Sequence, residues 1–102
     1  MPPKFDLLTA TADVFTPLIG QVFEVVFPDG RLPWTLAEVR PLGPIGQGRN
    51  RAPFSLTFHG APTLRLPQHI YRLEHATLGT LEIFVVPIAG DAGATKFEAI
   101  FT

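Results

Sequence analysis

The chain contains no cysteine and few charged residues, and both absences narrow what it can be. Without cysteine it has neither a disulfide framework nor a thiolate nucleophile, so its stability must come from packing. Charged residues make up 17% of the chain and the formal net charge is −1, which provides no field that steers it toward nucleic acid or an anionic membrane. We therefore expect neither a nucleic-acid partner nor a membrane partner.

Long apolar runs are also missing. No run approaches the ~20 residues that cross a bilayer, and the segment MPPKFDLLTA has no charged region followed by the continuous apolar stretch of a signal peptide. Together with the lack of cysteine, which fits a reducing compartment, this predicts a cytoplasmic protein.

Apolar residues are plentiful, at 46% of the 102 residues, and nine of them are phenylalanine. This length predicts a single domain over residues 1–102 with a core rich in phenylalanine. Eleven prolines and nine glycines are scattered without a period, which is typical of short elements joined by turns. The composition therefore favours an all-β domain.

Residues 5–20 are the one region that predicts a helical or capping segment, since apolar residues recur there at three- and four-residue spacings. Thr11 is placed to begin the helix and Asp13 adds negative charge to its first turn. Pro17 and Gly20 favour an early end. We expect a short helix that packs over a sheet edge or a barrel mouth.

From residue 21 to residue 102 the pattern predicts antiparallel strands. Positions 23, 25 and 27 share one face, and Pro28-Asp29-Gly30 predicts a three-residue turn in which the glycine takes a positive φ. Trp34 continues the apolar face of the return strand and is expected in the core, whereas Val39 is out of phase with it. A bulge near residues 37–38 would restore the phase and bend the strand.

Further strands are predicted over residues 54–59, 64–66, 70–75, 81–87 and 97–101, with loops over 42–51 and 89–95. The 70–75 and 81–87 segments predict a tight hairpin. The expected fold is all-β: a small antiparallel barrel or two-layer sandwich of six to seven strands with a short N-terminal helix.

Histidines are the first candidates for chemistry, because imidazole titrates near neutral pH and binds metals. His59, His69 and His75 lack the paired spacing of a zinc site, and no cysteine supports them. No nucleophile motif is present either. We expect no catalytic residue, no metal and no cofactor.

A polar cluster on the 69–87 hairpin is the second candidate. Arg72, Glu74 and His75 lie within cross-strand reach of Glu82. The four residues either form a ladder of solvated pairs or contact a ligand, and the sequence leaves both interpretations open.

The glycine-rich loop GPIGQGRNR is the third candidate. It lacks the lysine and the following helix of a phosphate-binding loop. Arg49 and Arg51, with Arg40 nearby, could instead bind an acidic partner.

The strings LPQHIYRLEHATLGTLEIFVVPI, LIGQVFEV and KFEAIF cover much of the chain. In the order of these motifs the chain resembles a family of small bacterial all-β domains of unknown function. The resemblance implies no catalytic residue, and it implies an association with phage-tail-like or collagen-like tail-fibre proteins.

The leading hypothesis is a non-enzymatic domain that works through protein–protein contact, as an accessory or structural piece of a phage-derived or surface assembly. The alternative is a small-molecule-binding or enzyme-like barrel that uses the polar face of the 69–87 hairpin. Uncovered strand edges would favour a homo-oligomer.

Overall fold

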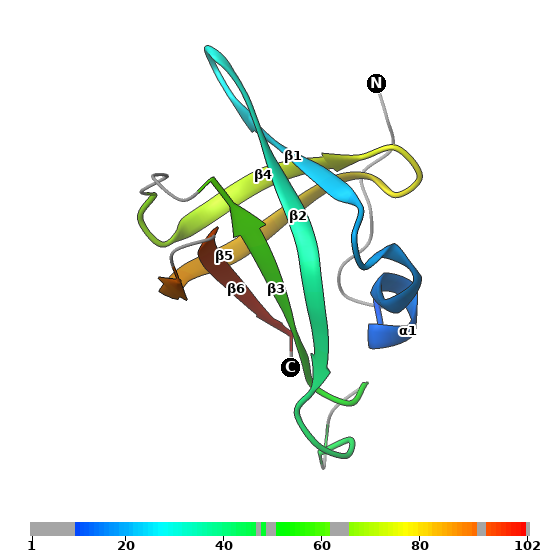
Figure 1. The fold of residues 1–102 in the computed structure, drawn as a ribbon. Helices are drawn as coiled ribbons and strands as arrows, with labels where there is room; N and C mark the ends of the chain where they lie inside the picture. The colour runs from blue at the N-terminus through cyan, green and yellow to red at the C-terminus, as the bar shows by residue number, and fades with distance from the viewer. Residues whose placement is uncertain (1–9, 47, 49–50, 62–65, 92–93, 102) are drawn as a thin grey trace.

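Six antiparallel strands follow a short helical segment and close into a barrel (Figure 1). The computed structural model describes residues 10–46, 48, 51–61, 66–91 and 94–101. Around the barrel the order is β1-β2-β3-β6-β5-β4, and β4 pairs with β1 to close the ring. The elements are α1 (Ala12–Phe15), the 3₁₀ helix η1 (Thr16–Leu18), β1 (Val22–Phe27), β2 (Gly30–Pro41), β3 (Phe54–Gly60), β4 (His69–His75), β5 (Gly79–Asp91) and β6 (Ala94–Phe101).

The predicted fold class is therefore confirmed, and of its two architectures the structure has the barrel. Every described pairing is antiparallel. Short turns require this for the hairpins β1–β2, β4–β5 and β5–β6, whereas β2–β3, β3–β6 and β1–β4 join strands that are farther apart in the chain. None of the helices in the described part of the chain has the length and apolar character needed to span a bilayer.

The β1–β2 hairpin corrects one prediction. Phe27 pairs directly with Gly30, so the turn contains two residues, Pro28 and Asp29. Gly30 lies in β2 and does not take a positive φ, contrary to the predicted three-residue turn. Proline fixes φ near −65°, which suits the first position of an ordinary turn, and the two-residue loop leaves no position that needs a left-handed glycine.

The bulge in β2 is confirmed. The β2–β3 register shifts between Leu36 and Glu38, so that Val39 pairs with Leu56. One extra residue here restores the inward phase that Val39 had lost and bends β2 around the barrel.

The β4–β5 hairpin is also confirmed, with His75 opposite Gly79 and a three-residue turn between them. Gly79 has φ of 85°, a conformation that glycine adopts at little cost. The predicted loop over 89–95 is wrong in extent, because β5 continues to Asp91 and β6 begins at Ala94. The glycine and alanine content of this segment is typical of a loop. However, after a register shift that follows Ile88, Asp91 of β5 pairs with Ala94 of β6.

The 42–51 segment carries no strand or helix at the residues that the structure describes from Leu42 onward. Of the predicted 64–66 strand, residues 64 and 65 lie outside the described residues and Leu66 is not in a strand. The described strands therefore number six, the lower of the two expected values.

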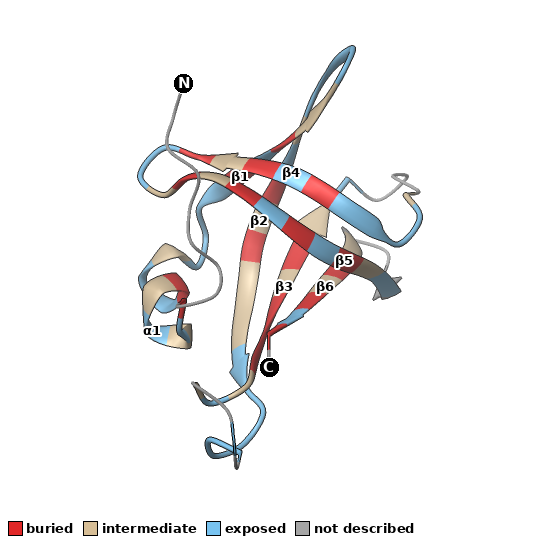
Figure 2. Cartoon of the chain, turned by 180° about the vertical axis from the view of Figure 1, so that it is seen from behind, coloured by how far each residue is buried: buried red, intermediate tan, exposed pale blue. Residues whose placement is uncertain are grey.

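All six strands contribute buried residues to the core of the barrel, and Figure 2 marks these residues in red. Trp34 is fully buried, which confirms its predicted core position, and its ring stacks on Phe97 with centroids 4.5 Å apart. Its Nε1–H has no hydrogen-bond partner among the described groups. The other fully buried large side chains are Phe15, Phe23, Phe54, Phe58, Phe97, Leu36, Leu56, Leu73, Leu81, Val25 and Val85.

The helical segment packs against one end of the barrel. Phe15 is fully buried, and its ring lies 5.9 Å from the rings of both Phe54 and Phe101. Thr11 is the N-cap residue of α1 but makes no side-chain capping hydrogen bond. Burial of Phe15, rather than capping, therefore holds so short a helix in place.

Candidate interaction surface

His75 faces the barrel interior rather than the polar face of its hairpin. It is 7% exposed, and its ring lies 4.6 Å from the ring of Phe23. Nδ1 accepts hydrogen bonds from the backbone N–H groups of Thr77 and Leu78, and Nε2 lies 2.7 Å from Oε1 of Gln21. These partners require a neutral ring that donates from Nε2.

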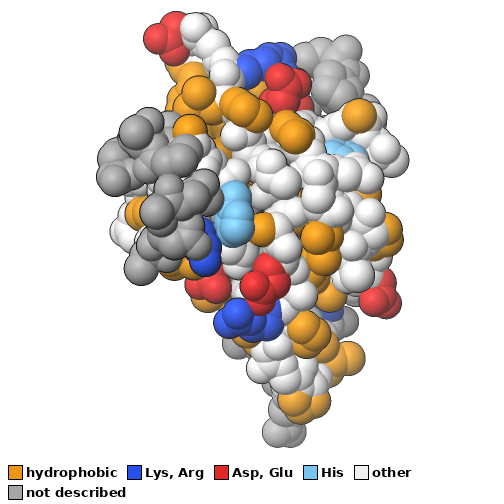
Figure 3. Space-filling view, viewed as in Figure 1, with side chains coloured by type: hydrophobic (Ala, Val, Ile, Leu, Met, Phe, Trp, Pro, Cys, Tyr) orange, Lys and Arg blue, Asp and Glu red, His pale blue; other side chains and the backbone are white. Residues whose placement is uncertain are grey.

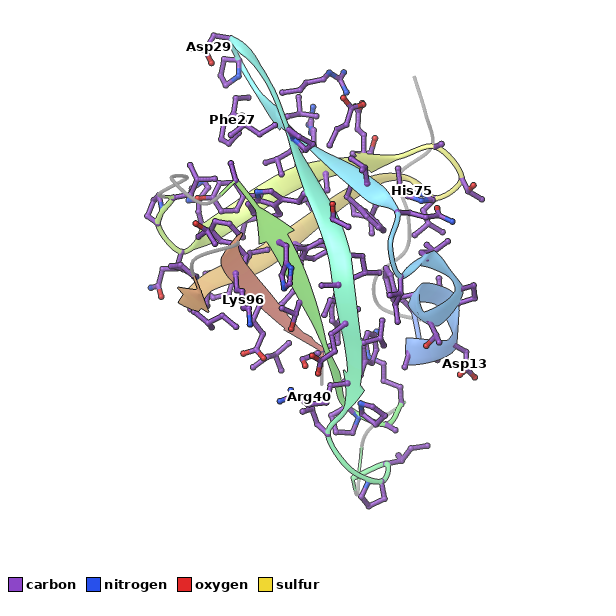
Figure 4. All side chains as sticks on the ribbon, in the orientation of Figure 1. Asp13, Phe27, Asp29, Arg40, His75 and Lys96 are labelled. Atoms are coloured by element: carbon purple, nitrogen blue, oxygen red, sulfur yellow. The ribbon has the colours of Figure 1, made fainter. Side chains whose placement is uncertain are left out.

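Burial of His75 lowers the pKa of its imidazole from the ordinary value of 6.5. The ring therefore stays neutral near pH 7 and joins the β4–β5 turn to the residue before β1. In Figure 4 it lies where this hairpin meets the start of β1. The geometry describes a structural histidine.

Glu74 and Arg72 face outward from β4, on the other side of the strand from His75. Arg31, on the neighbouring hairpin, donates a hydrogen bond to Glu74 and lies 3.7 Å from a carboxylate oxygen of Glu24. The carboxylate of Glu74 raises the pKa of the Arg31 guanidinium. Arg72 pairs in register with Glu82, and both side chains are exposed.

The structure thus brings Arg72 and Glu82 together, and separates them from His75. An exposed cross-strand pair of this kind is what the ladder interpretation of the predicted cluster describes. Each such pair contributes about 0.2–1 kcal/mol to stability.

Arg51 lies at the other end of the barrel. Its Nη1 donates to the backbone oxygen of Ala10 at 2.6 Å, and its guanidinium carbon lies 5.7 Å and 5.3 Å from the ring centroids of Phe54 and Phe101. The side chain therefore clamps the start of the helical segment over the aromatic end of the barrel. Arg49 lies outside the described residues.

A hollow of about 310 Å³ lies beside Arg51, between α1 and the end of β2. Asp13 and Arg51 supply its charged groups, and the remaining lining residues are Thr11, Ala12, Pro41, Ile45, Ala52, Pro53 and Phe54. This hollow contains none of the residues of the predicted hairpin cluster.

Large apolar side chains also gather outside the barrel, on β4, β5 and β6. Ile70, Phe84 and Ile100 are 58%, 53% and 60% exposed. Ile70 and Phe84 are directly opposite in the β4–β5 register. We call this set, with the half-buried Val86 and the exposed Ile88, the outer apolar surface.

Between β5 and β6 the outer apolar surface is hollowed. A space of about 230 Å³ is lined by Phe84, Val86, Glu98 and Ile100. Pairing between the two strands begins at Val86 and Glu98 and runs from there toward the β5–β6 turn. On the other side of this pair, Phe84 of β5 and Ile100 of β6 line the hollow, but the two residues are not paired in the β5–β6 register. We call the place between Phe84 and Ile100 the β5–β6 opening.

Charged side chains elsewhere are interspersed. On the face turned to the viewer in Figure 3, basic and acidic side chains lie beside one another. Arg40 and Glu38 form an ion pair with 2.8 Å between a guanidinium nitrogen and a carboxylate oxygen. Figure 4 places Arg40 near the end of β2 and Lys96 on β6, both pointing away from the barrel. Across the described residues, His, Cys, Asp and Glu side chains form no group of three that could hold a metal ion.

Sequence reasoning did not predict the outer apolar surface, although a signal was present. The runs IFVV and AIF break the apolar–polar alternation, so each must place a large apolar side chain on the polar face. Phe84 and Ile100 are those side chains.

The fold and its surfaces define a small closed β-barrel domain capped at one end by a short helix. A family model described as a domain of unknown function, DUF6916, matches residues 10–101, and the chain belongs to this family. The resemblance to a family of domains of unknown function is thereby confirmed in that part. No curated protein and no solved structure matches the chain.

Proposed function

We propose that this barrel is a non-enzymatic protein-interaction domain that binds its partner through the outer apolar surface. One observation carries the proposal: Ile70, Phe84 and Ile100 are each more than half exposed beside a hollow in the same wall. Contiguous apolar side chains of this size on a soluble surface are typical of a contact site.

The composition of the wall supports this proposal. Leu73, Leu81 and Val85 already fill the inner side of β4 and β5 and are fully buried. The outward-facing residues Ile70, Phe84 and Ile100 do not contribute to that core, so core packing does not explain why they are apolar. Contact with a partner protein explains it.

The biological setting we propose is a phage-derived or surface assembly, in which the domain is an accessory or structural piece. A compact barrel that exposes one apolar surface suits such a role, and the same surface could serve a symmetric homo-oligomer.

Photo-crosslinking tests the proposal. A photoreactive amino acid replaces Ile100 in the full chain, and a matched variant carries it at Ile45, which is 59% exposed but lies by α1. We expect a discrete crosslinked protein from position 100 and none from position 45, in the cell that produces the chain. Equal yields at both positions, or no crosslink from a folded bait, would contradict the proposal.

Small-molecule binding is the alternative function, and the hollow beside α1 favours it. Its volume of about 310 Å³ reaches the lower end of the roughly 300–1,000 Å³ that ligand pockets occupy. Arg51 would contact an anionic group. A titration of small carboxylates and phosphates, followed by NMR, should shift signals around Arg51 in the wild type and not in Arg51→Met; unchanged spectra would reject this alternative.

A further inference from the structure

We propose that the β5–β6 opening accepts an extended segment of the partner protein, which adds as a strand along β6 and places one apolar side chain in the adjoining hollow. This inference rests on the proposed function, because it states how the outer apolar surface would hold its partner. It is carried by the backbone on both sides of the opening and by the residues that line the hollow.

The backbone of β6 has two different neighbours. On one side, β3 pairs with every residue of β6 after Ala94, from Gly60 opposite Thr95 to Phe54 opposite Phe101. On the other side, β5 pairs with it only as far as Glu98. Beyond Glu98, β6 presents to the opening an edge that no described strand covers.

Proline indicates which backbone groups point into the opening. Pro87 lies opposite Phe97 and has no N–H, so this pair cannot exchange two backbone hydrogen bonds. The hydrogen-bonded pair is therefore the next one, Val86 with Glu98. Because strands alternate with a period of two, the N–H and C=O groups of Phe84 and Ile100 point into the opening.

An extended peptide is the partner that matches these groups. Unpaired N–H and C=O groups on a strand edge are a template for another strand, and flanking pockets then select its side chains. A drug-sized ligand fits less well, because the hollow of about 230 Å³ is below the roughly 300 Å³ at which such pockets begin. One apolar side chain of a peptide suits it better.

The lining residues specify the chemistry of the segment. Phe84, Val86 and Ile100 form apolar walls, and Glu98 adds a carboxylate. The segment should therefore alternate apolar and polar residues, insert one apolar side chain and carry a lysine or arginine near Glu98.

The test uses the full chain and a library of short random peptides, from which binders are selected and synthesised. We expect binders that lose about tenfold or more in affinity with Ile100→Lys and that bind normally to Ile45→Lys, the matched control. N-methylation of a binder at alternate positions should weaken it about tenfold per hydrogen bond lost, whereas the intervening positions tolerate the methyl group.

Two further measurements report on the backbone. Ile100→Pro removes the N–H that points into the opening and leaves the pairing of β6 with β3, so binding should fall while the barrel stays folded. Hydrogen exchange of the Ile100 amide in the wild type should slow at least about tenfold when peptide binds. This second measurement needs no variant, so it holds even if Ile100→Pro fails to fold.

The outcomes separate the two proposals. Binders that depend on Ile100, tolerate every N-methyl group and leave its amide unprotected would overturn strand addition and leave the interaction function standing. A homodimer that Ile100→Lys dissociates would show that the occupant is a second copy, which overturns the proposed partner. If no peptide depends on Ile100 and crosslinking at position 100 captures nothing, both proposals are wrong.

Discussion

The wall formed by β4, β5 and β6 carries large apolar side chains on both faces, but only one face is covered. On the inner face, Leu73, Leu81 and Val85 are fully buried; on the outer face, Ile70 and Phe84 are more than half exposed. The two sets alternate along the same strands, as Figure 2 shows for β5. Side chains of equal hydrophobicity therefore lie in two different environments, and only their burial tells the two sets apart.

This comparison leads to a clear energetic expectation. Burying a large apolar side chain is worth about 1.5–3 kcal/mol, and an exposed one retains most of its contact with water. Stability should depend on the inner face and binding on the outer face, and the following predictions test this division.

The largest effect is expected at the centre of the inner face. Phe97→Ala removes a fully buried ring that stacks on Trp34, and we expect it to lower the free energy of unfolding by about 3–5 kcal/mol. Urea denaturation followed by tryptophan fluorescence measures this loss. A loss below about 1 kcal/mol would mean that the barrel interior repacks freely, and the division between faces would fail.

A similar but smaller effect is expected where the helix meets the barrel. Phe15→Ala removes the ring that contacts Phe54 and Phe101, and it should cost about 3 kcal/mol because the short helix can shift to fill part of the space. Urea denaturation gives the value, with Val14→Ala as the control at a half-buried position of the same helix. Equal effects at both positions would show that Phe15 is not the anchor.

His75 tests the polar part of the inner face through pH. Burial lowers its pKa in the folded protein below 6.5, so the unfolded chain binds the proton more readily. The neutral ring therefore stabilises the barrel fully above about pH 6.5, and this contribution is lost as the pH falls through the lower folded pKa.

The measurement is the free energy of unfolding between about pH 7.5 and 5, compared in wild type and His75→Gln. We expect the wild type to lose more stability than the variant over this range. Parallel curves for wild type and His75→Gln would exclude the neutral histidine as a source of stability.

The smallest effect on stability is expected on the outer face. Phe84→Lys and Ile100→Lys should each change the free energy of unfolding by no more than about 0.5 kcal/mol, because both side chains are already largely in water. Chemical denaturation checks this, with Phe97→Ala as the reference for a buried site. A loss as large as that of Phe97→Ala would show that the outer residues support the fold.

Much of the barrel could be predicted from period-two patterning. The inward positions of β1, the core position of Trp34 and the bulge that returns Val39 to phase all follow from one rule: a strand in a closed wall has one dry face. Closure of the ring itself was one of two options, because pairing between β1 and β4 depends on tertiary geometry.

The remaining differences have local causes. The turn at Pro28 depends on a loop length that composition does not fix, and the extension of β5 to Asp91 depends on pairing with β6. His75 was grouped with Arg72 by chemistry, although its odd position in β4 places it with Leu73 on the inner face. The two-residue period of the strand predicts the side on which His75 lies better than its polarity does.

The ring of strands closes through its shortest ladder. β1 and β4 share three residue pairs, from Glu24 opposite Glu74 to Val26 opposite Arg72, and these residues lie far apart in the chain. To form this ladder the chain must close the long loop between β1 and β4, which costs conformational entropy and gains only a few hydrogen bonds. The β1–β2 and β4–β5 hairpins, in contrast, form from residues that are close in the chain. Refolding should therefore assemble the β1–β2 and β4–β5 hairpins first and join them last, and native fluctuations should part the barrel at this junction before any other.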